Sequence, residues 1–166
     1  AWYIWDRSKL EGAMHEGTEM ELISTDRDLS YDINLPAGRY RLMYKVTAKK
    51  NNYSVITQTN FDVTTELARG FYILKETADG NTDIDLYYKE GEPVMKDLFQ
   101  SLGYGTMPGK PVSLSSLYGM GYINKDDNKI YNSHAVSVTT DAGLIRMYNA
   151  LDLSLIHDNS DVLYGG

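Results

Sequence analysis

Apolar and polar residues alternate along most of this chain, and the alternation predicts a protein built from β-strands. The clearest run spans residues 39–47, in which every second side chain is apolar: Tyr40, Leu42, Tyr44 and Val46. Successive side chains of a strand point to opposite faces of its sheet, so we expect these four to point inward. The strand returns over residues 53–63 after a turn at residues 49–52, with Val55, Thr57, Thr59, Phe61 and Val63 in phase.

Three more strands are expected in the first 65 residues, over 1–6, 20–23 and 29–35. In the first, Trp2 and Ile4 share one face, and Tyr3 and Trp5 share the other. The segment 8–18 is polar and contains two glycines, which predicts a loop. Five strands joined by hairpin turns predict an antiparallel sandwich.

The stretch Gly70–Tyr88 predicts a tight hairpin and the start of a second region. The apolar runs 71–74 and 84–88 flank the turn sequence Ala78-Asp79-Gly80-Asn81. Asp-Gly between two such runs is a strong hairpin signal, because glycine accepts a positive φ without steric cost.

The rest of the chain predicts one short helix among further hairpins. The helix is expected over residues 92–102, with Pro93 in its first turn and Gly103 as its cap. Residues 103–121 are rich in glycine and predict a loop around a short strand at 112–117. A last hairpin is expected from strands at 135–140 and 144–149. Repeated hairpins with long loops predict a partial, propeller-like arrangement.

The predicted protein is therefore all-β with two domains. Residues 1–66 form an antiparallel sandwich. Residues 70–166 form a hairpin-rich, propeller-like region that is truncated.

Composition narrows the possible partners. The net charge is −7, and residues 70–166 carry −6 of it, so the surface repels phosphate backbones and nucleic acid is not expected as a partner. The chain has no cysteine, which excludes disulfides and thiolate metal sites. No apolar run approaches the ~18 residues of a membrane helix.

Residues 29–63 resemble the end of a PKD domain. Within them LSYDINLPAGRYRLMYKVT, residues 29–47, matches the Pro-x-Gly turn and the Tyr-x-Leu-x-Tyr-x-Val-Thr strand of that domain. The segments 70–76 and 83–86 resemble PKD-like lipoproteins of Bacteroidetes, in which a degenerate PKD module precedes a propeller-like region. The resemblance implies an exported protein on the extracellular face of the outer membrane, linked with SusC/SusD-like nutrient uptake. It implies that residues 1–66 are an immunoglobulin-like sandwich whose first strands are missing. It also implies attachment through a lipidated segment outside this chain, and it supplies no catalytic residues.

Four aromatic residues are candidates for ligand binding: Tyr104, Tyr118, Tyr122 and Trp5. The three tyrosines lie in the glycine-rich segment, where their rings could be open to solvent and stack on sugar rings. The alternative is that these side chains pack between strands, with each hydroxyl group bonded to the backbone.

Four residues are spaced like the oxygen ligands of a calcium loop: Asp79, Asn81, Asp83 and Asp85. Glu90 stands at the twelfth position, but Ile84 stands where an EF-hand loop needs glycine. We favour an acidic hairpin in which Asp and Asn stabilise the turn, and we expect no cofactor.

Three functions are compatible with these patterns. The leading hypothesis is a non-catalytic surface module that binds a neutral glycan, another nutrient ligand or a protein partner. The second is a structural spacer or a scaffold for protein interactions. The third is a glycan-active hydrolase, although no nucleophile elbow or paired-histidine motif is present and abundant acids alone do not define a catalytic pair.

Overall fold

The structure of the chain is a computed structural model, and it describes residues 1–11, 15–16 and 19–162. The described chain is an all-β protein of antiparallel strands with two very short α-helices. It divides into two compact units. The first unit comprises residues 1–64 and 121–132, and the second comprises residues 65–120 and 133–166.

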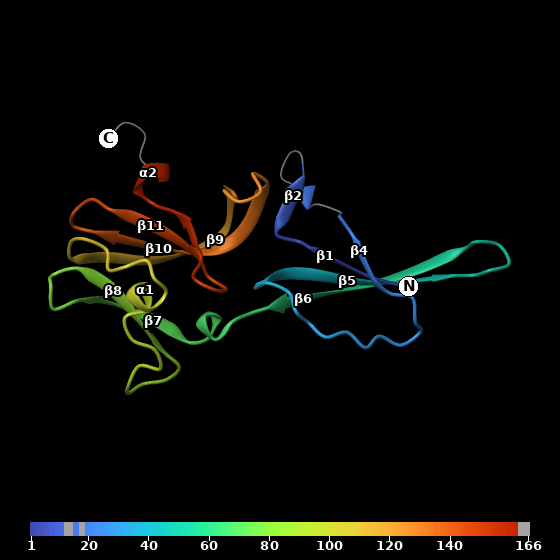
Figure 1. Ribbon diagram of the computed structural model, residues 1–166, viewed down its shortest axis with the longest axis horizontal. Coiled ribbons are helices and arrows are strands. Elements are labelled where there is room, and N and C mark those ends of the chain that lie inside the picture. The colour runs from blue at the N-terminus through green and yellow to red at the C-terminus, as the bar shows by residue number, and fades with distance from the viewer. Residues whose placement is uncertain (12–14, 17–18, 163–166) are drawn as a thin grey trace. The chain divides into compact units, whose positions relative to one another are not determined.

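The first unit contains an antiparallel sheet in the order β4-β1-β5-β6 (Figure 1). Its strands are β1 (Trp2–Asp6), β4 (Glu21–Ser24), β5 (Gly38–Thr47) and β6 (Ser54–Val63). The strands predicted over 1–6, 20–23, 39–47 and 53–63 are thereby confirmed. Strands β5 and β6 are paired over their full lengths, from Gly38 opposite Val63 to Thr47 opposite Ser54.

The loop predicted over residues 8–18 is wrong in part, because two short strands lie there. They are β2 (Lys9–Glu11) and β3 (His15–Glu16). Strand β2 pairs with the start of β10, where Ile130 lies opposite Leu10. This partner is far away in the sequence, so the local pattern carries no sign of the strand. Residues 12–14 and 17–18 of the predicted loop lie outside the described part.

The strand predicted over residues 29–35 is also wrong. The segment alternates apolar and polar residues, but residues 29–36 have no regular secondary structure. Tyr31 and Ile33 are exposed, so the alternation does not mark a buried face here. The segment is fastened at its end, where the Tyr40 hydroxyl donates to the Pro36 carbonyl at 3.0 Å.

The predicted inward face of β5 holds at one end only. Tyr40 is buried, and Leu42 and Tyr44 are half-buried. Val46 is 49% exposed, whereas Met43 on the opposite face is 5% exposed. The reason is that β1 pairs with β5 only as far as Tyr44, so the remaining hairpin extends past the sheet (Figure 1).

In the second unit, the predicted Asp-Gly hairpin is confirmed. A 3-10 turn, η1 (Glu66–Ala68), precedes β7 (Phe71–Glu76), which pairs with β8 (Thr82–Tyr87). Gly80 lies in the turn between the two strands with φ +75°. The turn closes with Thr77 N–H donating to the Asn81 carbonyl at 2.8 Å.

The predicted helix over residues 92–102 is much shorter in the structure. Helix α1 covers Leu98–Ser101 alone. Met95 pairs with Leu86 as an extra bridge beside β8, and this pairing holds the preceding segment in an extended form. Asp97 then takes a left-handed conformation with φ +52°. Long-range pairing thus overrides the local helical pattern.

The remaining strands form an antiparallel meander. Strand β9 (Pro111–Ile123) pairs with β10 (Ile130–Thr140), which pairs with β11 (Ile145–Asn149), and β11 pairs with β12 (Leu155–His157) before α2 (Asn159–Val162). The hairpin predicted across residues 141–143 is confirmed. The short strand predicted at 112–117 is confirmed, but β9 is longer than predicted, because it also includes residues 118–121 that were expected to be loop. Gly119 accommodates a positive φ of 67° within β9.

The buried core of the second unit brings these elements together. Ile84 and Leu86 of β8 are fully buried, and Leu98 and Phe99 of α1 pack with them. The rest of the cluster comes from the loop after the helix and from the meander: Met107, Val136, Val138, Tyr148 and Leu153.

Candidate ligand-binding site

A cavity of about 880 Å³ lies within the first unit. This volume is in the range of about 300–1,000 Å³ that small-molecule sites occupy. Its lining comes from β1, β2, the start of β4, the segment before β5, the start of β5 and the β9–β10 connection with the start of β10: Ile4, Trp5, Asp6, Lys9, Leu10, Glu19, Met20, Glu21, Leu35, Tyr40, Lys129 and Ile130.

The cavity rests on the pairing of β1 with β5. Asp6, the last residue of β1, lies directly opposite Tyr40, so these two side chains share one face of the sheet. Asp6 Oδ1 accepts the backbone N–H of Ser8 at 2.8 Å and also the Ser8 hydroxyl. These bonds fix the carboxylate at the point where the chain leaves the sheet for β2.

The phenol of Tyr40 is a rigid part of the wall. The side chain is 6% exposed, and its hydroxyl donates to the Pro36 carbonyl. Burial, with the nearby Asp6 carboxylate and the Tyr31 phenol, raises the pKa of Tyr40 to about 12. The phenol is therefore neutral at physiological pH, and because it is as buried as Trp5 it presents only a small part of its ring and its oxygen to the cavity.

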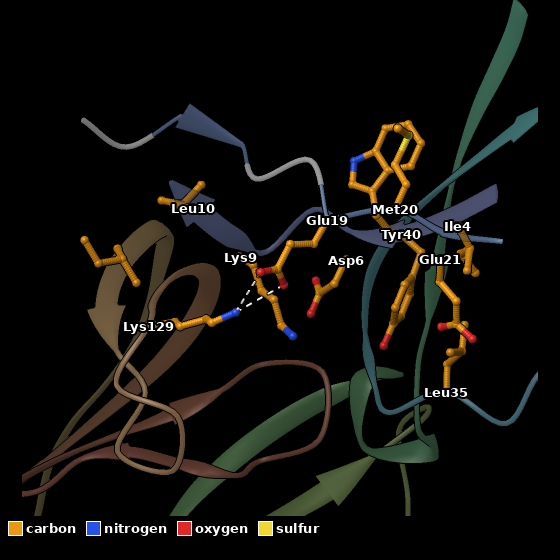
Figure 2. Close-up of a pocket in the computed structure, with 12 residues that line it drawn as sticks. Ile4, Asp6, Lys9, Leu10, Glu19, Met20, Glu21, Leu35, Tyr40 and Lys129 are labelled. Atoms are coloured by element: carbon orange, nitrogen blue, oxygen red, sulfur yellow. Dashed lines mark hydrogen bonds and ion pairs between the residues drawn. The ribbon is translucent and has the colours of Figure 1, made fainter. Parts of the chain in front are cut away.

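Charged side chains of both signs face the other side of the cavity. Figure 2 shows Lys9, Glu19 and Lys129 converging there, and the Asp6 carboxylate lies between them and the Tyr40 ring. The Lys129 amino group contacts both carboxylate oxygens of Glu19 at 3.1 Å. Both partners are largely solvent-exposed, so we assign this pair little stabilising energy. It offers donors and acceptors that a ligand can use.

Trp5 is the one predicted binding residue that lines this cavity. Its side chain is 7% exposed, and the Arg41 guanidinium lies 5.5 Å from the centre of its ring, opposite it on β5. A cation stacked on an indole face stabilises the pair and occupies that face. Trp5 therefore contributes mainly to the structure of the wall and exposes only a small part of its ring.

Tyr122 belongs to the same unit but does not line the cavity. Its ring stacks on that of Tyr131 at 5.9 Å, and Lys9 lies 6.0 Å from the Tyr131 ring. The Tyr131 hydroxyl donates to Asp127 at 2.9 Å. Burial raises the pKa of Tyr131, and the bond to Asp127 raises it further. Tyr122 thus packs against Tyr131, which in turn contacts Lys9 of the cavity wall.

The other two candidate tyrosines lie in the second unit and differ from each other. Tyr118 is 88% exposed and stacks on the His134 ring at 4.2 Å, while Gly119 N–H donates to His134 Nδ1 at 3.2 Å. Tyr104 is half-buried against Tyr148, and its hydroxyl accepts the Leu155 N–H at 3.2 Å. Tyr104 thus follows the packing alternative, and Tyr118 presents an open ring.

The four residues of the predicted calcium loop do not converge. The buried carboxylate of Asp83 accepts backbone N–H groups from Ile84 and Phe99, and Asp85 accepts the Asp97 N–H at 2.9 Å. Asp79 and Asn81 lie in the turn, outside the strand that carries the other two. Within the described residues, no group of three or more acidic or histidine side chains is arranged to hold a metal ion.

Lys75 joins Asp85 to Asp97, with 2.7 Å from its amino group to each carboxylate. Burial alone would lower the pKa of Lys75, but the hydrogen bonds and charges of the two carboxylates outweigh it and raise the pKa. These two ion pairs hold the segment before α1 against the β7–β8 hairpin. They also neutralise Asp85, which was one of the predicted calcium ligands.

Sequence reasoning missed most of the cavity. Glu19, Glu21, Lys9 and Lys129 carry most of its charges, and their local sequence does not distinguish them from ordinary surface residues. The sequence indicated only one part of the cavity, the pairing of Asp6 with Tyr40, because the strands that carry these two residues were predicted. The place of Lys129 depends on the pairing of β10 with β2, which no local pattern indicates.

The described chain is an all-β protein with a cavity of ligand size beside an antiparallel sheet. The sequence profile of the PKD-like family matches residues 1–111 of the 166. The chain therefore belongs to the PKD-like family. The matched region holds every lining residue of the cavity except Lys129 and Ile130.

No curated protein and no solved structure matches the chain. In the part of the chain that the structure describes, no helix is both long and apolar enough to cross a bilayer.

Proposed function

We propose that this protein is a non-catalytic binding module that holds a neutral glycan, or another uncharged nutrient ligand rich in hydroxyl groups, in the cavity of its first unit. The observation that carries the proposal is the cavity itself, with small exposed parts of the Tyr40 and Trp5 rings in its wall and charged groups facing them. Sugars bind through stacking of their C–H faces on aromatic rings and through hydrogen bonds from their hydroxyl groups to polar side chains.

The charge balance of the wall favours a neutral ligand. Three carboxylates (Asp6, Glu19 and Glu21) face two ammonium groups (Lys9 and Lys129), which leaves a local charge of −1. Carboxylates accept hydrogen bonds from hydroxyl groups and ammonium groups donate to them, so a polyol can use both kinds. The net charge of −7 raises the cost of approach for anionic polysaccharides.

The proposed setting is the outer-membrane surface of a Bacteroidetes-type cell. There the module would work beside a SusC/SusD-like transporter and be attached through a lipidated segment outside this chain. The support is the resemblance of residues 29–63 to the end of a PKD domain and of residues 70–76 and 83–86 to lipoproteins of that kind, together with membership of the PKD-like family.

We also propose finer assignments for the two units. The first unit is a PKD-type sandwich, supported by a β5–β6 face that carries Tyr40, Leu42, Tyr44 and Val46 and no charged residue. The second unit is propeller-like, supported by the meander β9-β10-β11-β12, because four antiparallel strands in succession are the unit of a propeller blade.

A scaffold for protein partners is the second candidate function. The observation in its favour is the apolar end of the β5–β6 hairpin, where Val46, Tyr53 and Val55 are 49%, 67% and 61% exposed. Exposed apolar clusters of this kind mark interaction surfaces.

A glycan array on the purified chain, followed by calorimetry with a glycan that binds, tests the proposed function. Lys9→Ala removes a cavity side chain and should weaken binding about tenfold, the loss expected for one charge-assisted hydrogen bond. Lys49→Ala removes an exposed lysine from the β5–β6 turn and is the matched control, which should bind like the wild type. Equal affinity in both variants would remove the cavity from consideration, and turnover of the glycan would overturn the non-catalytic assignment.

A further inference from the structure

Strand β6 (Ser54–Val63) forms one edge of the first unit's sheet. It is ten residues long, and among the described residues it pairs with β5 alone. Residues 55–60 are all exposed, so both faces of the strand are open as well as its outer edge.

The hydrogen bonds of the hairpin identify which residues of β6 present their backbone to this outer edge. Lys45 exchanges two hydrogen bonds of 2.9 Å with Ala1, next to β1, so its backbone turns away from β6. Lys45 lies opposite Ile56, and hydrogen-bonded and open pairs alternate along an antiparallel ladder. The outward N–H and C=O groups therefore belong to every second residue: Ser54, Ile56, Gln58, Asn60 and Asp62.

This edge lacks the features that usually protect edge strands. Proteins block such edges with lysine, proline, bulges or very short strands. Strand β6 contains no lysine, arginine or proline, and its register with β5 is continuous over ten pairs. Its one charged residue, Asp62, stands next to the end of the strand.

We propose that this edge binds a second copy of the chain, with β6 of each copy paired antiparallel about a two-fold axis at Gln58. Outward-facing residues must pair with outward-facing residues, which restricts the register. An axis at Gln58 uses all five of them. It sets Gln58 opposite Gln58 of the second copy, Ile56 opposite Asn60, and Ser54 opposite Asp62.

The side chains suit this self-pairing. On the uncharged face, Val55 meets Phe61 of the second copy, Thr57 meets Thr59, and Tyr53 meets Val63. Aromatic–β-branched and Thr–Thr pairs are among the favourable cross-strand combinations. No like charges are opposed anywhere along the pair, and a two-fold contact needs this kind of self-complementary surface.

The pairing also covers apolar side chains that the single chain leaves in water. Val55 and Ile56 are 61% and 51% exposed and lie within the new contact. A strand from an unrelated protein could form the same backbone hydrogen bonds. Its side chains would not be expected to complement those of β6 in the symmetric pairs around Gln58. The match is what favours a second copy as the occupant.

Analytical ultracentrifugation of the full chain from about 10 µM to about 1 mM tests the proposal. High concentrations are needed because a contact made by one pair of edge strands is small, and small contacts associate weakly. The wild type should show a monomer–dimer equilibrium. Gln58→Lys and Gln58→Glu each place like charges opposite one another at the axis and should weaken the dimer about fivefold or more. An equimolar mixture of the two variants should restore it, since the lysine introduced in one copy then faces the glutamate introduced in the other.

Two further variants separate edge pairing from a loss of folding. Gln58→Pro removes an outward N–H without touching the ladder to β5, and it should abolish the dimer while the melting temperature changes little. Lys49→Glu changes a charge in the turn outside β6 and should leave the dimer intact. A monomeric wild type, dimers in Gln58→Pro, or a mixture that dimerises no better than its components would each overturn the proposal.

Discussion

The carboxylate of Asp83, on β8, caps the N-terminus of helix α1. Its Oδ1 accepts the backbone N–H of Phe99, sixteen residues later in the chain, at 2.9 Å. The same oxygen accepts the N–H of Ile84 at 2.7 Å, and Oδ2 accepts that of Gln100 at 3.4 Å. The first N–H groups of a helix have no partner within the helix, and Asp97 at the cap position makes no side-chain cap bond. A fully buried strand carboxylate supplies that partner instead.

Removing this carboxylate should destabilise the second unit. Asp83→Ala leaves buried N–H groups unpaired, and we expect a loss of about 1–3 kcal/mol in the free energy of unfolding. Urea denaturation followed by circular dichroism measures it. Asp79→Ala, in the exposed turn of the same hairpin, is the control and should cost less than about 0.5 kcal/mol. Equal effects of the two substitutions would contradict this role of Asp83.

Chelation should leave the fold unchanged. The carboxylates of Asp83 and Asp85 already accept hydrogen bonds from backbone N–H groups, and Lys75 neutralises Asp85. We therefore expect the same melting temperature in EDTA and in millimolar calcium, because a ligand that binds only the folded state would raise it. A calcium-dependent rise that Asp79→Ala abolishes would establish the ion site that we do not favour.

The effect of a substitution at Gly80 should depend on whether the new residue can adopt a positive φ, and not on the size of its side chain. Its φ is +75°, and a Cβ added there would meet only the Glu76 carboxylate, at 4.0 Å. A β-branched residue resists this region, so Gly80→Val should lower stability by about 1–2 kcal/mol. Gly80→Asn should lose less, since asparagine visits the left-handed region more readily. Thermal melting of the two variants makes the comparison, and equal melting temperatures would show that the turn does not depend on this conformation.

The first unit should lose stability at alkaline pH through Tyr40. Its pKa rises from 10.0 to about 12 on folding, chiefly by burial. The unfolded chain then releases the phenolic proton first, so this contribution to stability is fully present below the unfolded pKa and is lost between pH 10 and 12. Tyr40→Phe should flatten this fall and, by losing the bond to Pro36, cost about 1 kcal/mol at neutral pH. The test is to measure the melting temperatures of the wild type and of Tyr40→Phe between pH 10 and 12. If the melting temperature falls equally steeply with pH in both, Tyr40 is not the cause of the fall.

Local patterns predicted the elements that depend on neighbours in sequence. The β5–β6 and β7–β8 hairpins follow from alternation and from turn residues such as Gly80, and both were expected. Elements that depend on distant partners were not. Strand β2 exists because Leu10 meets Ile130, and the helix is cut short because Met95 pairs with Leu86.

The candidate site shows the same limit. Tyr104, Tyr118 and Tyr122 were candidates because they lie in a glycine-rich segment, which was expected to expose their rings to solvent. Tyr104 instead packs on Tyr148, and the three do not line one cavity. The cavity depends on charged residues from separate elements, and nothing local distinguishes such residues from an ordinary solvated surface.

The measurement that tests the central claim most directly is a ¹H–¹⁵N NMR titration of the chain with a glycan selected on the array. The account predicts that amide shifts concentrate at residues 4–6, 9–10 and 129–130 around the cavity. The amides of the β7–β8 hairpin should stay unchanged, and the glycan should be recovered intact. Shifts confined to Tyr118 and its neighbours on β9 and β10 would place the ligand elsewhere and contradict the account.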